Sequence, residues 1–199
     1  MNTPILILAA GASSRMQGRD KLLEPVANMP LLRHVVLRAL QSGAPVYVVL
    51  DPNHPERNAC IDGLAFQAVW VSHPETGMSQ SLTAGIRALP KDTRAVIVAL
   101  ADMPEIDTVD YTKLISAHQA DLMKNILRCT TPSGKTGHPV LMPDWVFEEI
   151  LQLSGDEGAR SILKRHTNKV SHVPLIDRRA TIDLDTPEDW NNWRSRRQH

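Results

Sequence analysis

The stretch ILILAAGASSRMQGRDKLL, residues 5–23, decides the fold that we expect for this chain. Its opening apolar run is typical of a buried strand in a parallel sheet. The run then breaks into small residues, where Gly11 can adopt positive φ and backbone N–H groups can approach a ligand closely. Two cations, Arg15 and Lys21, follow. A buried strand that ends in a small-residue loop with nearby cations favours phosphate binding.

This stretch matches neither of the two common nucleotide-binding loops. A P-loop needs Gly-x4-Gly-Lys-Ser/Thr, but Met16 stands where the second glycine would be. The dinucleotide fingerprint needs Gly-x-Gly-x-x-Gly, which Ser13 and Ser14 interrupt. The remaining alternative is a strand followed by an ordinary loop with two solvated cations. The length and position of the pattern favour phosphate binding over that alternative.

The composition indicates a soluble globular protein. With 199 residues, 42% hydrophobic and 22% charged, we expect one domain over residues 1–199 with a substantial core. A formal net charge of zero gives no field that favours nucleic acid or a membrane surface as a partner. We expect a cytoplasmic location, because the start resembles no signal peptide and no apolar run is long enough to span a membrane. Cys60 and Cys129 lack metal-site spacing.

Strand and helix patterns alternate along the chain, which predicts a three-layer α/β/α sandwich. The run at 95–100 is the most apolar, and we expect it at the centre of the sheet. The run at 65–71 is less hydrophobic and is expected nearer an edge. The other expected strands are 46–50, 125–129, 139–142, 169–173 and 181–184, with a turn at 134–137. Expected helices begin near 30, 79, 108, 144, 159 and 187, with Thr108 and Thr186 as N-caps.

Two acidic groups follow separate predicted strands. Asp102 comes directly after the most apolar strand, and Asp183 and Asp185 lie near the end of the last one. Ligands of open α/β sheets bind at the carboxyl ends of strands, and Mg²⁺ prefers carboxylate oxygens. A buried carboxylate also needs a cation or a hydrogen-bond partner. The pattern therefore predicts a magnesium site, although Asp102 could instead simply cap the next turn.

Three segments resemble a known family, the nucleotidyltransferases with a GT-A-like fold. Residues 8–21 resemble the signature Leu-Ala-Ala-Gly-x-Ser-x-Arg-Met-Gly-x-x-Lys, except that Gln17 takes the place of the usual glycine and Gly18 follows it. Residues 100–104 resemble the family's Leu-Gly/Ala-Asp-Met-Pro motif, and residues 183–189 resemble its Asp-Ile-Asp/Asn-Thr-Pro-Glu-Asp motif. The resemblance implies a mostly parallel, Rossmann-like sheet. It also implies catalytic Lys21, Arg15 and Asp102, and a metal held by Asp102 and Asp185, with Asp183 as second choice.

The segment GMSQSL, residues 77–82, is similar to an element of molybdenum cofactor cytidylyltransferases that faces the nucleobase. Glycine followed by a serine-rich first helical turn exposes backbone N–H groups and hydroxyls. The resemblance implies that Gly77, Ser79 and Ser81 bind the nucleotide. On spacing alone, Ser79 could equally be an ordinary N-cap.

Two further segments resemble elements on the acceptor side of the same group. GHPVL, residues 137–141, implies that His138 lies near the acceptor pocket, although an ordinary loop histidine is the alternative. GDEGAR, residues 155–160, implies an anion-binding turn that includes Gly158. The alternative there is a solvated connection, and we assign no catalytic role to Arg160.

The resemblance to this group also implies a reaction. Its members join the CMP part of CTP to the terminal phosphate of molybdopterin, release pyrophosphate and use Mg²⁺. Leu-Ala-Ala-Gly at residues 8–11, in place of Leu-Ala-Gly-Gly, favours CTP over GTP. Alternatives are a guanylyltransferase of the same pathway, transfer to a sugar or polyol phosphate, and a non-catalytic nucleotide-binding chaperone for a client molybdoenzyme. The residues expected to line the nucleotide are Leu8, Ala9, Ala10, Gly11 and Ser13.

Overall fold

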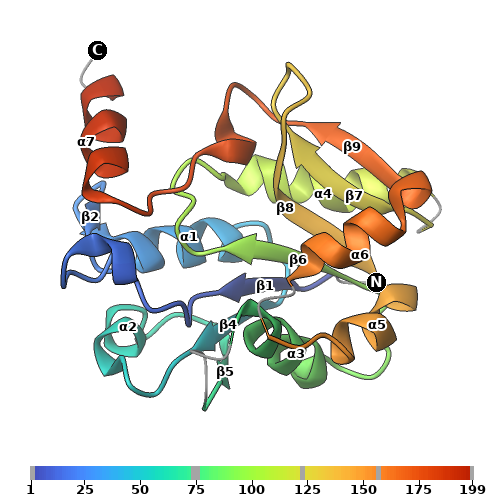
Figure 1. Ribbon diagram of the computed structural model, residues 1–199, viewed down its shortest axis with the longest axis horizontal. Coiled ribbons are helices and arrows are strands. Elements are labelled where there is room, and N and C mark those ends of the chain that lie inside the picture. The colour runs from blue at the N-terminus through green and yellow to red at the C-terminus, as the bar shows by residue number, and fades with distance from the viewer. Residues whose placement is uncertain (1–2, 73–76, 122–123, 156–157, 198–199) are drawn as a thin grey trace.

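The computed structural model describes residues 3–72, 77–121, 124–155 and 158–197, which form a mixed sheet with helices on both faces (Figure 1). The strand order is β5-β4-β1-β6-β8-β7-β9, and β2 pairs with β3 in a separate hairpin. Within the large sheet, β8 runs antiparallel to β6 and β7, and the other neighbouring strands are parallel. The strands are β1 (Ile5–Leu8), β2 (Pro25–Val26), β3 (Met29–Pro30), β4 (Val46–Leu50), β5 (Gln67–Trp70), β6 (Ala95–Leu100), β7 (Ile126–Thr130), β8 (Thr136–Pro143) and β9 (Val170–Pro174).

The two faces of the sheet bury separate apolar clusters, because successive residues of a strand point to opposite sides. Ile5 and Ile7 of β1 belong to the cluster under α1, α4 and α7, whereas Leu6 belongs to the cluster under α3, α5 and α6. This confirms the predicted α/β/α layers in a single domain. The helices are α1 (Leu31–Leu40), α2 (Pro55–Cys60), α3 (Met78–Ala88), α4 (Thr108–Ala120), α5 (Phe147–Leu151), α6 (Ala159–Arg165) and α7 (Pro187–Arg196). Short 3-10 turns are η1 (Ser14–Met16), η3 (Asp144–Val146), η4 (Thr167–Lys169) and η5 (Arg179–Thr181).

The hydrophobicity of the strands predicts their places correctly. β6 is the middle strand of the seven, and the less apolar β5 is at an edge, as expected. The mostly parallel character of the sheet is also confirmed, with β8 as the antiparallel exception. No helix within the described ranges is long and apolar enough to cross a membrane.

The predicted strand at 181–184 is wrong. The chain makes the 3-10 turn η5 there and continues as irregular backbone. The Leu184 N–H donates to the Asp102 carbonyl at 3.0 Å. That bond ties the segment to the loop after β6 without forming a ladder. The alternating pattern that predicts a strand here comes from one buried leucine, Leu184, between Asp183 and Asp185.

Two smaller boundaries also differ from expectation. The turn before β8 lies at Thr131–Lys135, so β8 already begins at Thr136. Asp107, not Thr108, is the N-cap of α4, because its carboxylate forms a capping box with Asp110. The predicted Thr186 cap of α7 is confirmed by a capping box with Asp189.

A close approach of α3 to β1 brings the start of that helix to the site. Gly85 of α3 packs directly on Leu6, and a Cβ at Gly85 would collide with the leucine side chain. Because glycine has no Cβ, α3 can pack this closely against the centre of the sheet. The Gly77 end of α3 consequently lies beside the loop that follows β1.

Candidate active site

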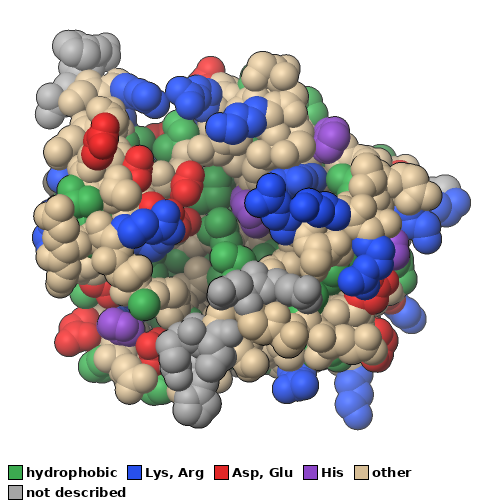
Figure 2. Space-filling model, in the orientation of Figure 1, with side chains coloured by type: hydrophobic (Ala, Val, Ile, Leu, Met, Phe, Trp, Pro, Cys, Tyr) green, Lys and Arg blue, Asp and Glu red, His purple; other side chains and the backbone are tan. Residues whose placement is uncertain are grey.

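A cavity of about 390 Å³ lies at the carboxyl ends of β1 and β6. It is formed by the loop after β1, the start of α3 and the loop after β6. Its lining includes eight of the predicted site residues: Leu8, Ala9, Ala10, Gly11, Lys21, Gly77, Ser81 and Asp102. Figure 2 shows this face as a hollow with acidic and basic side chains gathered on one rim and a further group of Lys and Arg on the other.

Lys21 joins the two carboxylates that the sequence assigns to a metal. Its Nζ lies 2.6 Å from Asp102 Oδ2 and 2.5 Å from Asp185 Oδ1. Arg15 Nη2 reaches the other oxygen of Asp185 at 2.9 Å. Burial alone lowers the pKa of Lys21, but the two carboxylates outweigh that effect and hold the pKa above its ordinary value. The ammonium is therefore a fixed positive charge at the mouth of the cavity.

The carboxylates at this point fit a divalent cation. Asp102 Oδ1 is buried and has no hydrogen-bond partner, which leaves one hard oxygen unsatisfied. Within the described ranges, no three His, Cys, Asp or Glu side chains gather into a complete metal site. Mg²⁺ does not need one, because it binds through one or two carboxylates together with substrate phosphates and water. Asp102 and Asp185 could thus supply part of such a ligand set.

Asp183 lies apart from this pair. Its side chain is exposed and lines a different hollow, next to Trp193 and Arg196 of α7. Partial desolvation by the surrounding chain raises the pKa of Asp183, and the charges of Asp102 and Asp185 raise it further. Asp185 is the acid that contacts Lys21, so the geometry favours it over Asp183 as a metal ligand.

A buried arginine that the sequence analysis missed holds the loop after β1. Arg57 of α2 is fully buried and donates from Nη1 to the Ala9 carbonyl at 2.7 Å and from Nε to Asp20 Oδ2 at 2.6 Å. Its Nη2 also lies 3.2 Å from Ser13 Oγ. Asp20 in turn accepts from the Leu22 N–H at 2.9 Å. No motif or periodicity in the sequence identifies Arg57. The available signal was Asp20, an acidic residue of the loop for which the sequence suggested no cationic partner.

Ser13 contributes to this network and does not line the cavity. It adopts left-handed backbone, as does Gln17, the residue that replaces the family's glycine. The Ser13 hydroxyl donates to Asp20 at 3.2 Å. A role of Ser13 in binding substrate stays a prediction, and the structure gives it a part in shaping the loop.

Ser79 likewise points away from the cavity. It is completely buried, and its hydroxyl donates to the Gly155 carbonyl at 2.5 Å without capping α3. Met78 packs against Gly158, where an added Cβ would lie 3.3 Å from the methionine sulfur. The start of α3 is therefore joined to the turn before α6. Ser81, two residues after Ser79, is the serine of this element that lines the cavity.

His138 lies on β8, with a cis peptide bond to Pro139. Its Nδ1 is buried without a hydrogen-bond partner. Burial lowers the pKa of His138 to about 4, and the charge of Arg128 adds to the effect while Asp102 opposes it. The imidazole is therefore neutral at pH 7 and lies within the electrostatic reach of both Asp102 and Arg128.

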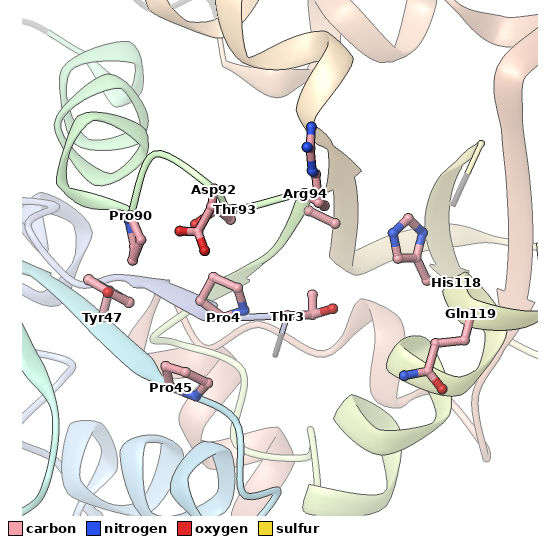
Figure 3. A pocket seen from close by; sticks show the side chains of 11 residues that line it. Thr3, Pro4, Pro45, Tyr47, Pro90, Asp92, Thr93, Arg94, His118 and Gln119 are labelled. Carbon is pink, nitrogen blue, oxygen red and sulfur yellow. The ribbon is translucent and has the colours of Figure 1, made fainter. Parts of the chain in front are cut away.

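A second cavity, of about 240 Å³, lies at the opposite, amino-terminal ends of the central strands (Figure 3). Residues before or at the start of β1, β4 and β6 line it, among them Pro4, Pro45 and Arg94. His118 of α4 is its buried polar side chain. None of the predicted site residues lies there. Since ligands of open α/β sheets bind at carboxyl ends, the cavity beside Lys21 is the candidate active site.

Comparison with known proteins agrees with this geometry. A family model described as "MobA-like NTP transferase domain" matches residues 5–170, which include the loop after β1, the start of α3 and Asp102. The chain belongs to the MobA-like NTP transferase family. The segment 183–189, with Asp185, lies beyond the matched residues.

Curated relatives of this MobA-like NTP transferase differ in length and in described function. The bifunctional protein GlmU of Clavibacter sepedonicus is 35% identical over 74% of this chain but only 31% of GlmU, so the chain spans about a third of that relative. The purine catabolism protein PucB of Bacillus subtilis is 29% identical over 96% of this chain and 97% of PucB. The molybdenum cofactor guanylyltransferase of Xanthomonas euvesicatoria is 28% identical over 94% and 91% of the two chains.

Solved structures share the fold of this MobA-like NTP transferase. Rv0371c of Mycobacterium tuberculosis superposes with a TM-score of 0.85 at 23% identity and 96% coverage of both chains. A complex of Rv0371c with manganese superposes with a TM-score of 0.80 at 21% identity, covering 96% of this chain and 97% of Rv0371c. A CMP-2-keto-3-deoxy-manno-octonic acid synthetase in complex with CTP superposes with a TM-score of 0.78 at 16% identity, covering 100% of this chain and 99% of the synthetase. At these identities the likeness shows the fold alone.

Proposed function

We propose that this MobA-like NTP transferase transfers the CMP part of CTP to the terminal phosphate of molybdopterin and releases pyrophosphate. The observation that carries the proposal is the contact of Lys21 with both Asp102 and Asp185 beside a cavity lined by the small-residue loop. The guanylyltransferase among the relatives, which acts in molybdenum cofactor synthesis by its name, supports the acceptor. A fold shared with a synthetase that binds CTP is compatible with the nucleotide.

In the proposed reaction, an oxygen of the acceptor phosphate attacks the α-phosphorus in line, and the bond to pyrophosphate breaks. Such a transfer needs positioning and charge stabilisation more than covalent catalysis. Lys21 neutralises the charge that grows on the α-phosphoryl oxygens. Arg15 and the N–H groups of the loop from Ala9 to Ala12 hold the leaving pyrophosphate.

The proposed metal is Mg²⁺, held by Asp102 and Asp185. When bound, it would supply positive charge to the phosphate oxygens. The buried and unpartnered Asp102 Oδ1 supports this assignment, and the manganese complex of Rv0371c is compatible with a divalent ion in this fold. Lys21 is the residue that keeps the two carboxylates together before nucleotide and metal arrive.

The choice of nucleotide and acceptor is tested by pyrophosphate release. The full chain is assayed with CTP and with GTP, each with and without molybdopterin and with a sugar phosphate in its place. Release that requires both CTP and the pterin supports the proposal. Pyrophosphate release that requires GTP would show that the chain is a guanylyltransferase. Release with the sugar phosphate and not with molybdopterin would show that a sugar phosphate is the acceptor.

A non-catalytic role is the alternative from another class. A chaperone for a molybdoenzyme would bind nucleotide without metal-dependent turnover. The contact of Lys21 with both Asp102 and Asp185 weighs against it, because a cation between two carboxylates is suited to binding phosphate and metal. Nucleotide binding measured by calorimetry, with no pyrophosphate release for any acceptor tested, would favour the chaperone.

A further inference from the structure

The second cavity of the molecule, at the amino-terminal ends of the central strands, is not used by the proposed reaction. We call it the His118 cavity, after the residue of α4 that lines it from one side. The candidate active site lies at the other ends of the same strands. Since β6 has six residues at about 3.3 Å each, roughly 20 Å separates the two cavities. A molecule bound in the His118 cavity would therefore leave the candidate active site open.

His118 is a buried side chain whose polar atoms are unsatisfied. It is 2% exposed, and neither its Nδ1 nor its Nε2 has a hydrogen-bond partner among the described residues. Its imidazole points into the cavity, toward the residues that precede the strands (Figure 3). Buried polar groups are nearly always hydrogen-bonded, because leaving one without a partner costs free energy. A partner for this ring would have to come from the cavity.

The protonation state of His118 decides which groups can satisfy it. Burial lowers the pKa of His118, although the charges of Asp121 and Asp144 oppose that effect, so the imidazole is neutral at pH 7. A neutral imidazole carries one N–H donor and one acceptor nitrogen, and a change of tautomer exchanges the two parts. A ligand that carries a donor and an acceptor side by side can therefore satisfy either nitrogen.

The walls of the His118 cavity beside the strands are apolar. Pro4 and Pro45 precede β1 and β4, and proline has no N–H to donate. The carbonyl of Pro4 accepts from the Ile97 N–H at 2.9 Å, and that of Pro45 accepts from the Ile5 N–H at 2.8 Å. Tyr47 adds an aromatic side chain. These walls favour a ligand with a flat apolar body. The volume of about 240 Å³ is just below the range typical of drug-sized ligands, about 300–1,000 Å³, and fits one or two rings.

The rim of the His118 cavity disfavours anionic ligands. Asp92 lies there with an exposed side chain, and its carboxylate is directed toward Pro4 (Figure 3). Arg94 also lines the cavity, but its guanidinium pairs with Asp144 at 3.1 Å. A ligand that carries a phosphate or a carboxylate would therefore meet an acid at the entrance, whereas an uncharged ligand would not be repelled.

We propose that the His118 cavity binds a small uncharged nitrogen heterocycle that carries an N–H donor next to a carbonyl or ring-nitrogen acceptor. The flat ring packs against Pro4, Pro45 and Tyr47, and its polar edge makes a hydrogen bond with the imidazole of His118. This is a second ligand site, separate from the cavity beside Lys21, and it does not depend on the proposed nucleotidyl transfer.

Direct binding of 2-pyridone tests this site, because the probe carries a lactam N–H beside a carbonyl on one flat ring. The full chain, labelled with ¹⁵N, is titrated with the probe. The readouts are the chemical shifts of the His118 imidazole and of the backbone amides of Thr93 and Gln119, which line the cavity. We expect saturable shifts with a Kd in roughly the millimolar range, because the probe has few atoms. Benzene, a ring of the same size without polar atoms, should bind at least about fivefold more weakly.

Variants of α4 show whether His118 is the residue that recognises the probe. His118→Leu removes both nitrogens and should weaken binding of 2-pyridone about fivefold or more. His118→Asn keeps a donor and an acceptor and should retain more affinity than His118→Leu, which guards against a folding defect. Ser116→Ala, exposed on the same helix, is the matched control, and Lys21→Met reports on the candidate active site. Both should bind the probe as the parent does.

Three results would overturn the proposal. The first is shifts at the His118 cavity that do not saturate, which would leave water as its occupant. The second is equal affinity for benzene and 2-pyridone, which would make the cavity a simple apolar void. The third is unchanged binding by His118→Leu, or loss of binding in Lys21→Met, which would place the probe elsewhere.

Discussion

Lys21 Nζ lies 2.6 Å from Asp102 Oδ2, although 81 residues separate the two positions in the chain. The same ammonium lies 2.5 Å from Asp185, which is 164 residues away. One cation therefore holds two carboxylates that would otherwise repel each other. This contact joins the loop after β1, the end of β6 and the segment before α7 at one edge of the sheet.

Replacing Lys21 by methionine should separate catalysis from metal affinity. We expect pyrophosphate release to fall by roughly 10²- to 10³-fold, because a charge that stabilises the transferred phosphoryl group is lost. We also expect Mg²⁺ to raise the thermal midpoint of this variant more than that of the parent, because the carboxylates lose their ammonium partner. The readouts are a pyrophosphate assay and thermal unfolding with and without millimolar Mg²⁺.

The control for this variant is Lys21→Met combined with Asp185→Asn. Removing one of the two carboxylates should abolish the additional stabilisation by Mg²⁺. Equal stabilisation of the single and double variants would show that Asp102 and Asp185 are not the pair that binds the metal. Near-normal pyrophosphate release by Lys21→Met would reject its catalytic role.

Arg57→Met should destabilise the fold through the loop after β1. Removing the buried guanidinium leaves Asp20 without its cation, a loss that typically costs about 3–5 kcal/mol. Arg57→Met with Asp20→Asn should cost less than the sum of the two single changes, because the uncompensated charge is gone. Urea unfolding of the four proteins gives the coupling free energy directly. Additive effects would show that the contact at 2.6 Å contributes little.

The convergence at the sheet edge was predictable from local patterns. Lys21 lies at the far end of the loop after the first apolar run, Asp102 directly follows another such run, and the carboxyl ends of parallel strands meet at one edge. β6 could be placed at the centre because all six of its residues are apolar. Those inferences need only the strand period and the topology of parallel sheets. Asp183 and Asp185 were assigned to the same edge through the predicted strand at 181–184, which is wrong, and the family motif favoured Asp185.

The remaining features depend on contacts that no local pattern encodes. Arg57 lies on a helix of six residues without apolar periodicity, and its role arises from the tertiary position of Asp20 and Ala9. Ser79 satisfies the rules for an N-cap, yet its hydroxyl donates a hydrogen bond to the carbonyl of Gly155, 76 residues away. The segment 181–184 alternates like a strand, but one hydrogen bond to the Asp102 carbonyl takes the place of a ladder.

His138 should make the fold sensitive to mild acid. In the folded chain the pKa of His138 is about 4, below its ordinary value near 6.5, so the unfolded chain binds the proton more readily. Stability is then complete above about pH 6.5 and decreases as the pH falls from there to about 4, by up to roughly 3 kcal/mol. Urea unfolding across this range, for the parent and His138→Gln, measures the difference.

For His138→Gln the curve of unfolding free energy against pH should be flatter between pH 6.5 and 4. Parallel curves for the parent and His138→Gln would show that this imidazole takes up its proton as easily in the fold as in the unfolded chain.

Gln17→Gly should stabilise the chain, because Gln17 has a φ of 53°. Left-handed backbone costs a residue with a Cβ about 1–2 kcal/mol, whereas glycine adopts it freely. Part of that gain is offset by the greater backbone entropy of glycine in the unfolded state, about 0.5–1 kcal/mol. We therefore expect a net gain of up to about 1 kcal/mol in the free energy of unfolding. Gln80→Gly, in the right-handed turn of α3, is the matched control and should lose about 1 kcal/mol. A loss of similar size at both positions would mean that the side chain of Gln17 makes contacts that outweigh the strain of its backbone.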